Sequence, residues 1–149
     1  SITPDLAMAK KIISELNLTD NVIYCCGKNV NGLSRDEMLD IYSLSDVVMD
    51  DFGAGWYGSI AVEALACGVP LVTYVPTQLL KSMFPWHPIQ VAKTPVEIGE
   101  SLLNLYENNE AAEYLRIKSK QWVDEFHSND VVRNRLENSL SNLLNSTAT

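Results

Sequence analysis

Short apolar runs alternate along this chain with longer segments whose apolar residues recur every three or four positions. The short runs are typical of buried strands and the longer segments are typical of amphipathic helices. Four runs predict strands near residues 22–26, 46–50, 71–75 and 89–92. The spaced segments predict helices near residues 4–16, 35–43, 58–67, 95–107, 112–126 and 132–143. Because strands and helices alternate through most of the chain, the pattern predicts an α/β fold with a mainly parallel sheet.

The most informative stretch is residues 45–75, which predict a strand, a glycine-rich loop, a helix, a turn and a second strand. The loop carries glycines that can adopt φ > 0 and let the backbone approach a ligand closely, at positions 53, 55 and 58. The following helix is almost wholly apolar, so we expect a buried crossover helix. Gly68 and Pro70 then end it, as a glycine just past the helix followed by a helix-breaking proline.

The start of this helix is a candidate binding site. Free backbone N–H groups at Gly58, Ser59 and Ile60 would attract an anion, and the helix dipole would strengthen that attraction. Glu63 is the only charged residue in the helix, and a buried carboxylate needs hydrogen-bond partners. Beside a phosphate site those partners would be sugar hydroxyls, which suggests a nucleotide with its diphosphate on the loop and its ribose on Glu63. A structural glutamate bonded to a backbone amide is an alternative of equal weight from spacing alone.

Residues 56–70, from Trp56 through Glu63 to Pro70, resemble the signature of retaining GT-B glycosyltransferases. The nearest branch is family four, the "glycosyl transferases group 1" set, whose signature ends in Glu-Ala-Met-Ala-Cys-Gly-x-Pro. In that family the second Glu of an E-x7-E pair binds the ribose of the sugar nucleotide, and Glu63 matches it. The first Glu, which lies near the donor sugar, is replaced here by Gly55.

The resemblance implies a Rossmann-like three-layer sandwich and metal-independent sugar transfer, with retention, from a nucleotide-sugar to an unknown acceptor. It implies that Gly53, Gly55 and Trp56 line the donor sugar, and that the loop with Lys28 and Asn29 lies beside the base. From the pattern alone, that second loop is equally well an exposed turn. The nucleotide-sugar is a substrate, so no cofactor and no metal are expected. The catalytic residues are unknown.

The resemblance also indicates how much of the family's donor-binding domain this sequence contains. The donor domain of that family normally begins with a strand, an Arg and Lys loop that grips the pyrophosphate, a helix and a second strand. This sequence matches from the helix that follows them. We therefore expect residues 1–149 to be a single, N-terminally truncated donor-binding domain, the later part of the C-terminal half of a GT-B enzyme, inactive alone. Its expected partner is the N-terminal domain, and exposed C-terminal helices would favour self-association.

Composition narrows the function further. The chain has 149 residues, 46% of them hydrophobic, and a formal net charge of -8, which argues against nucleic acid as a partner. No apolar run approaches the length of roughly 20 residues needed to span a membrane. Cys25 and Cys26 would point to opposite faces of a strand and Cys67 lies in a helix, so free thiols and a cytoplasmic location are expected. These cysteines show no zinc-binding pattern.

Three other features are weaker candidates for chemistry. Asp50 and Asp51 are adjacent, so their side chains should diverge and bind no metal together. Residues 76–90 are expected to form a loop in which His87 packs against Trp86, although a phosphate or sugar contact is an alternative. His127 ends a helix, where a cation is favourable.

Two rival functions stay open at this point. A nucleotide-sugar 2-epimerase shares the fold, but it would need acid/base carboxylates and histidines that are not apparent. A non-catalytic interaction module would use the helices that carry Trp122 and Leu140.

Overall fold

The computed structural model describes residues 4–22 and 33–146. Its contacts form two compact units, one within residues 1–35 and one within residues 36–149. The predicted single domain over residues 1–149 stays a prediction. The predicted strand near residues 22–26, with Cys25 and Cys26, lies almost wholly outside the described residues.

The first unit contains helix α1 (Pro4–Glu15) and the short 3-10 helix η1 (Thr19–Asn21). The helix begins at the predicted proline, whose fixed φ suits a first helical position. Its apolar residues Ile12 and Leu16 are nevertheless exposed, because only η1 accompanies it among the described residues of this unit.

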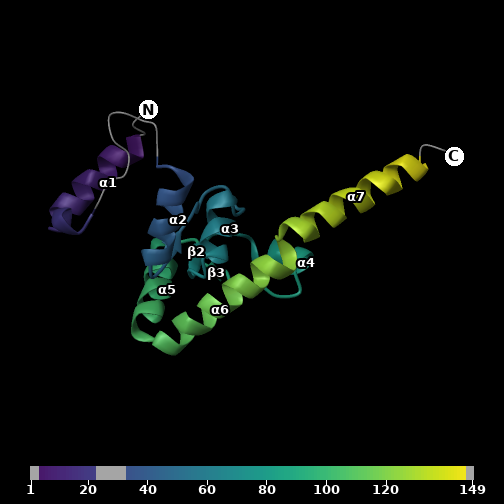
Figure 1. The fold of residues 1–149 in the computed structure, drawn as a ribbon. Coiled ribbons are helices and arrows are strands. Elements are labelled where there is room, and N and C mark those ends of the chain that lie inside the picture. Colours follow the sequence, from purple (N-terminus) through teal and green to yellow (C-terminus); the bar gives the residue numbers. More distant parts are fainter. Residues whose placement is uncertain (1–3, 23–32, 147–149) are drawn as a thin grey trace. The chain divides into compact units, whose positions relative to one another are not determined.

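The second unit is an α/β structure built on a parallel three-stranded sheet (Figure 1). The sheet order is β1-β2-β3, with Val48 opposite Leu71 and Val72 opposite Gln90. The strands are β1 (Val48–Met49), β2 (Leu71–Thr73) and β3 (Gln90–Val91), which confirms three of the predicted strands at reduced length. The helices are α2 (Arg35–Leu44), α3 (Ser59–Ala66), α4 (Thr77–Met83), α5 (Pro95–Glu107), α6 (Asn109–Phe126) and α7 (Asn129–Ser146).

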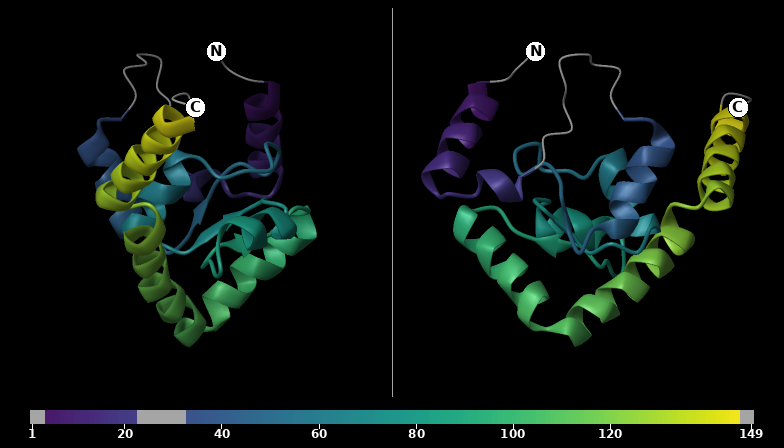
Figure 2. Two further views of the ribbon diagram at one scale, coloured as in Figure 1. Left: turned by 90° about the vertical axis from the view of Figure 1, so that its right-hand side faces the viewer. Right: turned by 60° about the vertical axis from the view of Figure 1, so that its left-hand side comes forward.

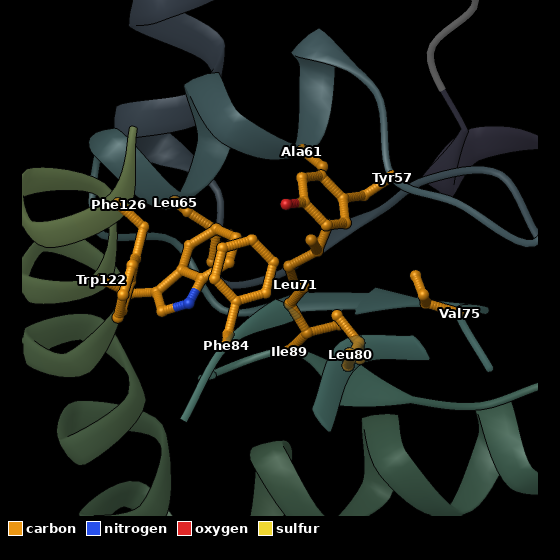
Figure 3. Close-up of a cluster of buried hydrophobic side chains, with 10 residues drawn as sticks. All are labelled: Tyr57, Ala61, Leu65, Leu71, Val75, Leu80, Phe84, Ile89, Trp122 and Phe126. Carbon is orange, nitrogen blue, oxygen red and sulfur yellow. The ribbon is translucent and has the colours of Figure 1, made fainter. Parts of the chain in front are cut away.

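Helices pack on both faces of β2, because successive side chains of a strand point to opposite faces. Leu71 belongs to the cluster drawn in Figure 3, which joins α3, α4 and α6 and includes Trp122 and Phe126. Val72 belongs to a second cluster, with Leu105 of α5 and Leu115 of α6. In both views of Figure 2, α5 and α6 form a V. The three-layer, Rossmann-like arrangement predicted from the sequence is therefore confirmed.

The helix ends follow the capping residues in the sequence. Thr94 and Glu97 form a complete capping box at the start of α5, and the Asn108 side chain accepts a hydrogen bond from Ala111 N at the start of α6. In contrast, residues 76–90 are not simply a loop, because α4 occupies the first half. Pro76 stands at the N-cap of α4, where its missing N–H costs nothing, and Leu80 packs into the core.

The face of α7 that carries Val132, Leu136 and Leu140 is exposed, with Leu136 at 60%. These apolar residues are the ones whose spacing predicts an amphipathic helix. No helix in the described part of the chain is both long enough and apolar enough to cross a membrane.

Candidate functional site

The glycine-rich loop is shaped by Asp51, which lies just beyond the carboxyl end of β1. Its Oδ1 accepts hydrogen bonds from Gly53 N at 2.6 Å and Ala54 N at 2.9 Å. These donors, Ala54 first, hold the pKa of the Asp51 carboxyl below its usual range. The main-chain oxygen of Asp51 accepts a hydrogen bond from Thr73 Oγ1 at 2.7 Å. Asp51 therefore folds the loop and ties it to the end of β2.

Asp50 connects β1 to the start of α3. Its Oδ2 lies 3.4 Å from the backbone nitrogen of Gly58, the N-cap residue, which donates to it. A carboxylate is favourable there because the positive end of the helix dipole faces it. The two aspartates accept hydrogen bonds from different backbone amides, and these structural roles were not predicted from the sequence. The signal was present, because an aspartate two residues before a glycine is typical of an Asx turn.

The predicted phosphate-binding residues do begin a helix. Gly58, Ser59 and Ile60 are all exposed, and no side chain caps Gly58. The amides of Ser59 and Ile60 belong to the first turn, where no intrahelical acceptor exists. The structure therefore brings together the backbone amides of three exposed residues, although Asp50 already engages the first of them.

The prediction that α3 is a buried helix holds for only some of its residues. Ala61, Ala64 and Leu65 are buried, whereas Ile60 is 47% exposed and Glu63 is half-buried. The helix packs against β2, α6 and α2, and its exposed residues are Ser59, Ile60 and Ala66. Glu63 thus lies at the boundary between core and solvent, where a ligand could reach it, and it is not a fully buried carboxylate.

The other predicted donor-sugar residues lie on the same loop. Gly55 has φ +72°, a left-handed conformation, and a Cβ built there would lie 4.0 Å from a ring carbon of Tyr74. Trp56 is half-buried and stacks on Tyr57 with ring centroids 4.5 Å apart. Gly53 is exposed. Glycine at position 55 is therefore favoured by the backbone conformation, whereas a Cβ there would make only ordinary contacts with its neighbours.

Tyr57 anchors this loop to the end of α6. Its hydroxyl lies 3.2 Å from His127 Nε2, and its ring meets Trp122 edge-on at 5.6 Å. Burial raises the pKa of Tyr57 to about 12. Burial, and then the charge of Arg135, lowers the pKa of His127. Both groups are therefore neutral near pH 7, so the predicted helix-ending cation at His127 is wrong.

His87 also offers no charge to a phosphate. Burial lowers its pKa most, a hydrogen bond with the backbone of Ile89 opposes this shift, and the charge of Lys81 lowers the pKa further. Its Nδ1 is buried without a hydrogen-bond partner. The neighbouring Trp86 donates through Nε1 to Glu125 Oε2 at 3.2 Å and packs against Phe126. The aromatic stretch therefore packs onto α6.

Lys28 and Asn29, the predicted base-binding residues, lie outside the described residues. Within the described part of the chain, no group of three or more His, Cys, Asp or Glu side chains could hold a metal ion.

A cavity of about 380 Å³ lies elsewhere, where the chain enters β1. Asp46 and Arg116, at its rim, form an ion pair of 3.5 Å. Leu102 and Leu105 of α5 provide apolar lining. Asp46 precedes β1 and the glycine loop follows it, so this cavity lies at the opposite end of β1 from the predicted site.

Comparison with known proteins relates the chain to glycosyltransferases. Over 70 residues it is 36% identical to D-inositol 3-phosphate glycosyltransferase from Mycolicibacterium vanbaalenii. The matched segment covers 47% of this chain and 14% of the length of that protein. No protein-family model matches the chain, and no solved structure matches it.

Proposed function

We propose that the unit formed by β1, the glycine-rich loop, α3 and β2 binds the nucleotide-sugar donor of a glycosyltransferase. The observation that carries the proposal is the similarity to a glycosyltransferase, joined to a glycine loop that opens onto a helix N-terminus at the carboxyl end of a parallel strand. Ligands of open α/β sheets bind at that edge.

In this proposal Glu63 accepts hydrogen bonds from the ribose hydroxyls. The amides of Gly58, Ser59 and Ile60 face the diphosphate, and Gly55 and Trp56 face the donor sugar. The exposure of this helix face and the half-buried position of Glu63 support these roles. Each hydrogen bond to a charged group contributes roughly 1.5–3 kcal/mol, so Glu63 alone would change affinity by about tenfold or more.

The finer parts of the proposal are a GT-B enzyme of family four, transfer with retention, and a cytoplasmic setting compatible with the free thiol of Cys67. The acceptor would be bound by a second domain. The chain described here would then hold the donor without transferring its sugar.

Calorimetric titration with UDP, GDP, ADP and dTDP tests the proposal. EDTA in the buffer shows whether binding is independent of metal. We expect saturable binding of one nucleotide, weakened about tenfold or more by Glu63→Ala. Glu100→Ala, on the exposed face of α5, is the matched control and should leave the affinity unchanged. Equal affinities for the Glu63→Ala variant and the wild type, or no saturable binding at all, would overturn the proposed donor site.

A further inference from the structure

Tyr57 is the point at which the glycine-rich loop enters the core. It directly precedes Gly58, the N-cap residue of α3, and its side chain is 6% exposed. Within residues 51–60, all of which the structure describes, Tyr57 is the single buried residue. The position of the loop end therefore depends on what holds this side chain.

Aromatic rings surround Tyr57 (Figure 3). Its ring centroid lies 5.6 Å from that of Trp122 and 6.4 Å from that of Phe84, and all three residues belong to one buried cluster. Trp56 stacks on the Tyr57 ring with centroids 4.5 Å apart. Burial of apolar surface is non-directional, so it stabilises the buried ring without selecting one orientation of the loop.

The hydroxyl of Tyr57 supplies a directional contact. It lies 3.2 Å from Nε2 of His127, the C-cap residue of α6, which is 70 positions away in the sequence. The His127 backbone N–H donates to Val123 O at 2.8 Å, and the His127 ring packs on Trp122 with centroids 4.4 Å apart. Since α6 holds the partner of Tyr57, this hydrogen bond connects the loop to a fixed support.

The other attachments of the loop are of a different kind. Asp50 and Asp51 accept hydrogen bonds from backbone amides of the loop at exposed positions, where water competes with them. A diphosphate at the start of α3 would also compete with Asp50 for the Gly58 amide. The hydrogen bond between Tyr57 and His127 is part-buried and uses no backbone amide of the loop, so it can persist when a nucleotide is bound.

We propose that Tyr57 and His127 are positioning residues for the nucleotide. Their hydrogen bond holds the end of the loop and the first amides of α3 in the arrangement that accepts a diphosphate, and holds Trp56 beside the donor sugar. Neither Tyr57 nor His127 contacts the ligand. A loop already held in its bound conformation loses less conformational freedom on binding, which raises affinity. The inference rests on the proposed donor site and adds two residues to it.

Two variants remove this hydrogen bond while keeping an aromatic ring in place. Tyr57→Phe deletes one oxygen atom, and His127→Phe deletes the hydrogen-bonding nitrogen. Loss of one such bond should weaken nucleotide binding about fivefold in either variant. Because both substitutions remove the same bond, the double variant should also bind about fivefold more weakly, and not about 25-fold.

The experiment titrates these variants calorimetrically with whichever of UDP, GDP, ADP and dTDP the wild type binds. Asn108→Ala is the matched control, because Asn108 caps the opposite end of α6 and its loss should also lower the unfolding temperature. The control should bind the nucleotide as tightly as the wild type. A merely structural hydroxyl at Tyr57 would behave like the control, since its loss would lower the unfolding temperature and leave the affinity unchanged.

The inference is overturned, with the donor site intact, if the wild type binds a nucleotide and Tyr57→Phe binds it equally tightly. It is also overturned if the losses of the two single variants multiply in the double variant, or if Asn108→Ala weakens binding as much as Tyr57→Phe. Since Tyr57→Phe removes a single oxygen atom, it decides the question even if His127→Phe fails to fold. If neither the wild type nor Asn108→Ala binds a nucleotide, the donor site is refuted, and the roles of Tyr57 and His127 with it.

Discussion

Gly68, which ends the helix carrying Glu63, offers a direct test of the local structure. It has φ +76°, and it donates its N–H to Leu65 O at 2.9 Å while Val69 N donates to Ala64 O at 3.0 Å. This pair of bonds is a Schellman motif, which requires a left-handed residue in this position. Substitution by alanine therefore strains the backbone whatever space is available.

Space is limited as well. A Cβ on Gly68 would lie 2.5 Å from Cε of Lys120 and 3.3 Å from the main-chain oxygen of Arg116. The flexible Lys120 side chain can move aside at little cost, whereas the Arg116 oxygen belongs to the backbone of α6. Left-handed strain of roughly 1–2 kcal/mol plus this displacement gives a loss of about 2 kcal/mol for Gly68→Ala. For a chain of this length, that lowers the unfolding temperature by roughly 4–8 °C.

Thermal unfolding followed by circular dichroism measures the effect, with Gly99→Ala as the matched control. Gly99 is exposed within α5 and has no atom within 4 Å of a built Cβ. The control should therefore raise stability by roughly 0.5–1 kcal/mol, because alanine favours a helix over glycine. A Gly68→Ala variant that unfolds at or above the wild-type temperature would refute the strained left-handed turn.

Four further outcomes are expected. Thr94→Ala removes the capping box of α5 and should cost about 1 kcal/mol in urea unfolding; an unchanged midpoint would count against the cap. Asp51→Ala should speed hydrogen exchange at the two loop amides and weaken nucleotide binding, whereas Asp51→Asn, which keeps the acceptor, should do so less. Folding lowers the pKa of His127 from its ordinary value of 6.5, so the stabilising contribution of this histidine is present above pH 6.5 and is lost on acidification. His127→Gln should therefore reduce the fall in unfolding temperature between pH 7.5 and pH 5.5, which lie about one unit above and below that pKa. Sedimentation should detect self-association that Leu136→Glu abolishes, and a concentration-independent monomer would contradict it.

Local sequence signals were sufficient for the helix ends. Gly68 ends α3 as predicted, and Thr94 and Asn108 are residue types that favour the N-cap positions they occupy at α5 and α6. These features depend on atoms a few residues apart, so a single sequence contains the whole interaction. The parallel sheet has long-range pairings, but the alternation of strands and helices along the chain was enough to predict it.

Features that depend on distant parts of the chain were harder to predict. The strands are two or three residues long, shorter than predicted. The prediction was too long because an apolar run indicates burial and does not show how many residues form strand hydrogen bonds. Residues 76–90 were assigned to a loop from the aromatic and proline-rich stretch at their end, although the apolar Leu80 faces the core from a helix. His127 is neutral because Trp122 and Tyr57 surround it, and neither contact is visible in its neighbouring sequence.

The charges around the glycine loop bear on how an acidic chain could hold an anion at the proposed donor site. The carboxylates of Asp50 and Asp51 are not simply repulsive, because each accepts backbone hydrogen bonds that hold the loop in place. A positive charge lies near the loop as well. Lys93 Nζ is 4.8 Å from the ring centroid of Tyr74, and the Tyr74 ring packs near Gly55 of the loop. A diphosphate at the start of α3 would compete with Asp50 for Gly58 N, so its binding would depend on the helix amides and dipole. Asp50 and Asp51 therefore build the loop, and in the proposed site Glu63 would recognise the uncharged hydroxyls of the nucleotide, for which a carboxylate is a suitable acceptor.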